Sequence, residues 1–149
     1  MRIDELAGNL TNSARFSATI NDALLLVTNL ETGSEYIIEE FDGSFQVRQA
    51  ICFDCLEWTG EELLSLYGLC SLANERFSGC KMFVDRWGVL VMASDVLATA
   101  ASVEFIEIIL GQIEFMSQAM LGLVETIRER GAAITEDEID SALESPSVQ

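Results

Sequence analysis

The chain has 149 residues, half of them hydrophobic, a composition that predicts one folded domain and lies outside the disordered class. Its 25 acidic and 8 basic residues give a net charge of −17, which excludes nucleic-acid binding because contact with phosphates needs clustered Lys and Arg. The absence of histidine removes the commonest general base and zinc ligand, which excludes His-dependent triads and most hydrolytic zinc sites.

The first segment, from about Ile3 to Phe16, spaces its apolar residues as a short helix does. The opening "MRIDELAGNL" lacks the long apolar core of a signal peptide, and no apolar run approaches the ~18 residues of a membrane span. We therefore expect a cytoplasmic protein with reduced cysteines and no membrane insertion.

Three strands are predicted between residues 24 and 53, as an antiparallel meander with short turns. Asp42-Gly43 is the strongest hairpin signal among them. Alternation in the last strand places one apolar set on the core face: Phe45, Val47, Ile51 and Phe53.

A second helix of about 17 residues follows, with a capping box of Thr59 and Glu62 at its start. Two further strands flank the turn from Asp85 to Gly88, whose final glycine is typical of a type I turn. Trp87 in this turn either folds back over the sheet edge or is presented to a partner, and its residue type favours folding back.

The long helix predicted from about Ser102 to Arg130 has a wider apolar surface than one packed face requires. Its core side carries Ile106, Ile109, Ile113, Met116, Met120, Val124 and Ile127, and a narrow polar stripe carries Glu104, Glu107, Gly111, Glu114, Gln118, Gly122 and Glu125. Between the two lie Phe105, Ile108, Phe115 and Leu123. Either the helix is sunk deeply into its own sheet, or it also packs on another chain.

Residues 1–131 are predicted to form a single α+β domain, and residues 132–149 an acidic C-terminal tail. A capping box at Thr135 and Glu138 predicts a short helix in this tail to about Leu143, before a frayed end at Pro146. The tail lacks the alternating Asp/Asn ligands and the Gly of a calcium-binding loop, so no metal is expected there.

The stretch "CFDC" gives Cys52 and Cys55 the spacing of zinc knuckles and thiol oxidoreductases. If the preceding strand continues to Cys55, the two side chains leave opposite faces of the sheet and cannot share a metal. Cys70 and Cys80 occupy apolar positions typical of buried free thiols. A structural role for all four is favoured, with a zinc site or a redox pair at Cys52 and Cys55 as the alternatives.

Motifs for catalysis or cofactor binding are absent from the sequence: it has no Gly-rich phosphate loop, no serine nucleophile elbow and no dinucleotide fingerprint. Asp85, Asp95, Glu104 and Glu107 are candidate catalytic carboxylates only by default. The sequence therefore predicts a protein that is not an enzyme, with no catalytic residues, cofactor or metal.

The expected order of elements, α-β-β-β-α-β-β-α, predicts an α+β fold in which helices pack on an antiparallel twisted sheet. This order, with the small size and high acidity, resembles the type III secretion chaperone fold. The stretch "LCSLANERFSGCKMFVDRWGVLVMASDVLATAASVEFIEIILGQIEFMSQAMLGLVETI" resembles the YbjN-type family of bacterial sensory transduction regulators, which is similar in fold to those chaperones. The resembling residues are Asn74, the hairpin from Lys81 to Ser94, the linker from Leu97 to Ser102, and Phe105.

Three functions are open at this point. The resemblance implies a non-enzymatic, protein-binding domain, often a homodimer, that acts as a regulator or holds a partially unfolded client. Its candidate dimer or partner surface consists of Phe105, Ile108, Phe115 and Trp87. The second function is an acidic inhibitor or immunity-type protein that masks a basic partner, and the third is a metal or redox site at Cys52 and Cys55.

Overall fold

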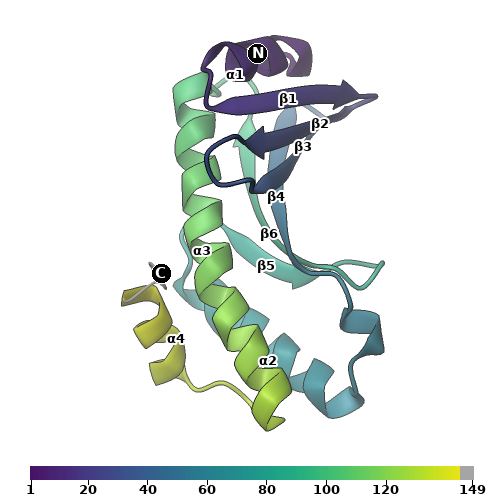
Figure 1. Ribbon diagram of the computed structural model, residues 1–149, viewed down its shortest axis with the longest axis vertical. Coiled ribbons are helices and arrows are strands. Elements are labelled where there is room, and N and C mark those ends of the chain that lie inside the picture. Colours follow the sequence, from purple (N-terminus) through teal and green to yellow (C-terminus); the bar gives the residue numbers. More distant parts are fainter. Residues whose placement is uncertain (145–149) are drawn as a thin grey trace. The chain divides into compact units, whose positions relative to one another are not determined.

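The computed structural model describes residues 1–144 and contains helices and one sheet (Figure 1). Its elements are α1 (Ile3–Asn12), β1 (Phe16–Asn21), β2 (Leu24–Asn29), β3 (Glu35–Phe41), β4 (Ser44–Cys52), the 3-10 helix η1 (Cys55–Glu57), α2 (Gly60–Arg76), β5 (Lys81–Val84), β6 (Leu90–Leu97), α3 (Val103–Arg130) and α4 (Glu136–Glu144). The strand order is β1-β2-β3-β4-β6-β5. The chain divides into two compact units: residues 1–49 with 93–114, and residues 50–92 with the chain from 115 onward.

The predicted α+β class and its order of elements are confirmed, with one further strand, β1, before the predicted meander. Strand β1 pairs antiparallel with β2 over its whole length. The helix predicted to reach Phe16 ends at Asn12, because Ala14 takes a left-handed conformation (φ 66°) and Phe16 begins β1. The sequence of β1, "FSATIN", alternates apolar and polar residues as a strand does, yet only Phe16 of this strand is buried.

The core of the first unit is built on the predicted meander of β2, β3 and β4. Alternation places six fully or nearly fully buried side chains on one face of these strands: Leu25, Val27, Tyr36, Ile38, Phe45 and Val47. Asp42 and Gly43 both have positive φ, 54° and 78°, which is the conformation of the tight hairpin turn that this dipeptide predicts.

In the second unit, α2 starts at the predicted capping box. The Thr59 hydroxyl accepts a hydrogen bond from the Glu62 amide, and the Glu62 carboxylate accepts one from the Thr59 amide. Together these bonds satisfy two N–H groups that a helix start leaves unpaired, so the sequence signal fixed this helix end correctly.

Strand β5 lies at the end of the sheet order, and a side chain from α2 occupies its free edge. Asn74 Nδ2 donates to the Met82 carbonyl at 2.9 Å, and the Met82 amide donates to Asn74 Oδ1 at 2.7 Å. The Asn74 amide thus takes the place that a neighbouring strand would have at this residue.

Helix α3 has 28 residues and the predicted burial pattern. Of its predicted core side, Met116 is half-buried and the others are buried. By length and composition α3 could cross a membrane, but 44% of its most apolar 18-residue stretch is buried inside the protein. One such helix is weak support for a membrane span, because the core helix of a soluble protein has the same character.

The tail forms α4 and contributes to the second unit. The predicted capping box is present, since the Glu138 amide donates to the Thr135 hydroxyl at 3.2 Å and the Thr135 amide donates to the Glu138 carboxylate at 3.0 Å. The frayed end expected at Pro146 lies outside the described residues.

Candidate protein-binding surfaces

The α3 residues of the first unit keep two large apolar side chains in solvent. Phe105 is 43% exposed and Ile108 66% exposed, and they are neighbours one turn apart on the helix surface. Glu107, between them in sequence, forms an ion pair with Arg15. The interpretation of a helix sunk deeply into its own sheet is therefore wrong for Phe105 and Ile108.

Phe115 and Leu123 belong to the second unit and behave differently. Phe115 is 40% exposed, whereas Leu123 is buried at 8% exposure. Of the four side chains that widen the apolar surface of α3, only Leu123 is buried in the core.

Trp87 is presented to solvent at the tip of the β5–β6 hairpin. It is 65% exposed, and the Arg86 guanidinium lies 4.2 Å from its ring centroid. The expectation that Trp87 folds back over the sheet edge is wrong, because the ring stacks on its sequence neighbour Arg86 instead. The turn fixes this geometry, since the Asp85 carboxylate accepts hydrogen bonds from the Trp87 and Val89 amides.

Sequence reasoning missed two large exposed apolar side chains, Phe53 and Leu56, which we group with Trp87 as the hairpin-tip residues. Their exposed fractions are 76%, 75% and 65%. The Cys55 amide donates to the Gly88 carbonyl at 3.1 Å, and the Leu56 side chain lies so close to Gly88 that a Cβ there would clash with Leu56 Cγ. Gly88, predicted only as a turn residue, is thus also needed for this close approach.

The outer face of the sheet in the first unit is apolar at its centre. Leu26 is 44% exposed and pairs with Ile37, whereas the adjacent Leu25 is fully buried. Beside them, Arg48 and Glu39 form an ion pair of 2.9 Å across β3 and β4. The run "LLL" does not reveal which of its side chains faces the core, so only the strand register identifies this surface.

The "CFDC" stretch turns where a continuing strand was predicted. Strand β4 ends at Cys52, and Asp54 leaves the extended conformation (φ −113°, ψ 26°) before η1 begins at Cys55. The strand does not continue to Cys55, so the expectation that the two cysteine side chains leave opposite faces of the sheet does not apply. Phe53, expected on the core face, is in solvent for the same reason.

Burial keeps all four thiols in their protonated form at neutral pH. It is the main cause that raises the pKa of Cys55 to about 12, that of Cys70 to about 11, and those of Cys52 and Cys80 above the ordinary value. Thiolates, not thiols, attack disulfides and bind metals. Within residues 1–144, no three His, Cys, Asp or Glu side chains are placed to hold a metal ion.

Asp54 anchors the loop that carries Phe53 and Leu56. Its carboxylate accepts hydrogen bonds from Cys52 Sγ at 2.8 Å, from Arg128 at 2.9 Å and from Trp58 Nε1 at 3.3 Å. The Arg128 guanidinium also lies 5.0 Å from the ring centroid of the buried Trp58. These contacts fasten residues 52–58 to the end of α3.

The carboxylates considered as catalytic by default have structural contacts. Asp85 accepts the turn hydrogen bonds, Asp95 accepts one from Gln46 Nε2 at 3.2 Å, and Glu107 pairs with Arg15. Glu104 is exposed in the first turn of α3. These contacts assign no chemistry to the four carboxylates.

Comparison with solved structures supports the fold. A chain of the ExsC–ExsE complex matches with a TM-score of 0.61 at 13% identity, covering 83% of this chain and 97% of that chain. A chain of the heterodimeric complex ExoU–SpcU from the type III secretion system of Pseudomonas aeruginosa matches with a TM-score of 0.47 at 20% identity, covering 70% and 83%. The first likeness confirms the predicted type III secretion chaperone-like fold, and at this identity it shows the fold alone.

No family model and no curated protein match the sequence. Membership of the YbjN-type family therefore stays a prediction.

Proposed function

We propose that this chain is a cytoplasmic, non-enzymatic protein-binding protein, chaperone-like or regulatory, that acts as a homodimer. The observation that carries the proposal is the pair of neighbouring exposed apolar side chains on α3, Phe105 and Ile108. Adjacent apolar side chains on a protein surface mark a site that a partner covers. The similarity to a chain that is itself part of the ExsC–ExsE complex supports protein binding, and the sequence resemblance to the YbjN-type family supports a regulatory role.

Two copies of this chain repel each other electrostatically, so an apolar contact is the favourable way for them to associate. Each copy carries a net charge of −17, so association must occur where acidic side chains do not oppose each other. Around Ile108, Glu107 is already neutralised by Arg15. Burial of an isoleucine side chain contributes about 1.5–3 kcal/mol, enough to matter in a dimer contact.

The test is the molar mass in dilute, reduced solution, measured by light scattering after size exclusion. We expect a dimer for the wild type and a monomer for Ile108→Glu, since loss of the burial and the cost of a buried charge weaken association by roughly a hundredfold or more. The matched control is Leu30→Glu, in the turn after β2, where the side chain is 59% exposed. This control should remain dimeric.

A monomeric wild type would contradict the homodimer and favour the second candidate, an acidic inhibitor of a basic protein. The observation behind this alternative is the net charge alone. It predicts association with a basic partner that weakens steeply between low and physiological salt, whereas an apolar contact responds little.

A further inference from the structure

Helix α4 is attached to the second unit through two apolar anchors. Ile139 is fully buried and Ile134, just before the helix, is 5% exposed. Every other residue of α4 is exposed or half-buried. A helix of nine residues has little stability by itself, so α4 depends on docking for its structure.

Two arginines complete the attachment. Arg76, the last residue of α2, contacts Asp140 at 2.7 Å and Glu136 at 3.4 Å. Arg130, the last residue of α3, donates to both carboxylate oxygens of Glu138 at 2.7 and 2.9 Å. The two arginines therefore make this surface a binding site for carboxylates, although the protein as a whole is strongly acidic.

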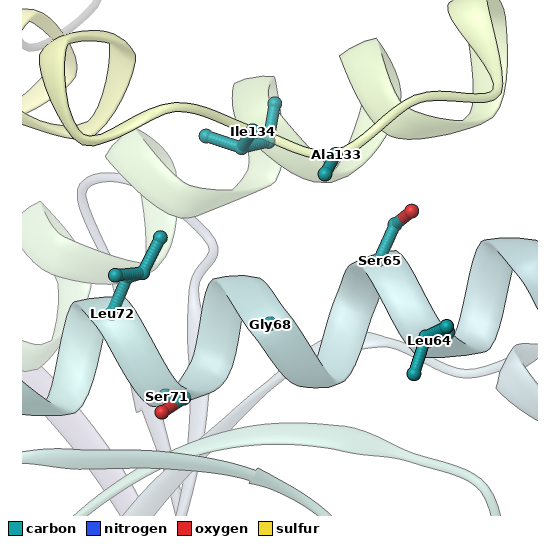
Figure 2. A pocket seen from close by; sticks show the side chains of 7 residues that line it. All are labelled: Leu64, Ser65, Gly68, Ser71, Leu72, Ala133 and Ile134. Atoms are coloured by element: carbon teal, nitrogen blue, oxygen red, sulfur yellow. The ribbon is translucent and has the colours of Figure 1, made fainter.

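The apolar part of the same surface is a groove that the tail fills incompletely. It has a volume of about 400 Å³ and is lined by Leu64, Ser65, Gly68, Ser71, Leu72, Ala133 and Ile134. Figure 2 shows the side chains of Leu72 and Ser65 directed toward the segment that carries Ala133 and Ile134. A Cβ at Gly68 would meet nothing within 4 Å, and Leu64 is 74% exposed. The groove thus has room for a larger apolar side chain than that of Ala133.

We propose that this tail-docking surface, formed by Arg76, Arg130 and the groove residues Leu64, Gly68 and Leu72, binds an acidic amphipathic helix of a partner protein. Helix α4 occupies the surface as an internal ligand until the partner displaces it. The charges decide the class of partner, because an occupant must present carboxylates to both arginines and apolar side chains to the groove. The α3 surface of the proposed function plays no part in this inference.

The contacts are of the kind that a partner can displace. Solvent-exposed ion pairs contribute little, and the carboxylates of Glu136 and Asp140 are 63% and 49% exposed. A tethered segment acts at an effective concentration of roughly millimolar, so a partner helix must bind more tightly than α4 does to displace it.

The experiment uses the full-length chain and, as probe, a synthetic peptide of residues 132–144, AAITEDEIDSALE. Binding is followed by the amide chemical shifts of Gly68 and Ser71. We expect the variant Ile139→Asp, in which α4 is released, to bind the peptide at least roughly tenfold more tightly than the wild type, whose own tail competes. Adding Arg76→Glu and Arg130→Glu to Ile139→Asp should abolish binding, and a peptide that carries the same Ile139→Asp change should not bind.

A second variant, Glu136→Lys with Asp140→Lys, releases α4 without placing a charge at a buried position, and it should bind the peptide as Ile139→Asp does. Equal binding by the wild type and both released variants would overturn the proposal, as would no binding by variants whose α4 amides exchange freely with solvent. Exchange of α4 between two copies would also overturn it, and would be detected as a dimer that Ile108→Glu leaves intact. The proposed homodimer is tested by mass and this surface by peptide binding, so either can fail without the other.

Discussion

Asp54 shows how one side chain can hold a loop in place. It lies within the "CFDC" stretch that looks like a metal or redox motif, yet its carboxylate binds a thiol, an indole N–H and a guanidinium. The hydrogen bond from Cys52, followed by those from Arg128 and Trp58, lowers the pKa of Asp54 from 3.8 to about 2. The charged form of Asp54 is therefore favoured in the folded state.

This pKa determines a pH dependence of stability. A carboxyl whose pKa is lower in the folded protein stabilises it fully above its ordinary value, and the contribution is lost as the pH falls from about 3.8 through about 2. We expect Asp54→Asn to have a lower free energy of unfolding than the wild type at pH 7, with a difference that shrinks as the pH approaches 2. Urea unfolding at several pH values measures it.

Glu31→Gln is the control, because Glu31 is exposed in a turn and also loses one negative charge. If both variants showed the same pH profile, the effect would come from net charge and not from the Asp54 contacts.

At the scale of the elements, the attachment of α2 to β5 rests on Asn74. An unpaired edge strand attracts other strands, and a side-chain amide that satisfies both backbone groups of one edge residue removes part of that attraction. Met82 itself is buried at 1% exposure, so its backbone groups gain little from water when the amide is removed. Asn74 thus joins two elements and protects an edge.

We expect Asn74→Ala to lower the free energy of unfolding by about 1–3 kcal/mol, since two hydrogen bonds to a buried residue are lost. The Met82 amide should exchange with solvent faster in this variant. Glu75→Ala, at the adjacent exposed position of α2, should change neither quantity. Unchanged exchange at Met82 in Asn74→Ala would contradict the role assigned to this amide.

For the whole molecule, the net charge of −17 opposes compaction. Sodium chloride screens this repulsion, so we expect the melting temperature to rise between low and physiological salt. The docking of α4 should become weaker over the same increase in salt, because the contacts of Arg76 and Arg130 are attractive ion pairs at the surface and salt screens them. Thermal unfolding and amide exchange of α4 are measured on the same salt series, and we expect the α4 amides to exchange faster as the melting temperature rises. Slower exchange of the α4 amides at higher salt would contradict this view.

The elements themselves could be predicted from sequence because their signals are local. The Asp42-Gly43 hairpin, the Thr59/Glu62 capping box and the core side of α3 each depend on residues within a few positions of one another. The same periodicity placed Phe105 and Ile108 outside the core side of α3, but it left open whether they are buried, and only the structure shows that they are exposed. Strand β1 was missed although "FSATIN" alternates apolar and polar residues, because the predicted helix was extended to Phe16, where the strand in fact begins.

The sequence by itself determined the α+β class, the order of its elements and the helical surface on which a partner is proposed. Only the tertiary structure decided that "CFDC" turns, that Trp87 is exposed beside Leu56, and that Arg76 and Arg130 hold α4. The physical reason is distance along the chain. Periodicity and capping act between neighbours, whereas the contacts of Gly88 with Leu56, Asp54 with Arg128 and Arg76 with Asp140 join residues that lie between 32 and 74 positions apart.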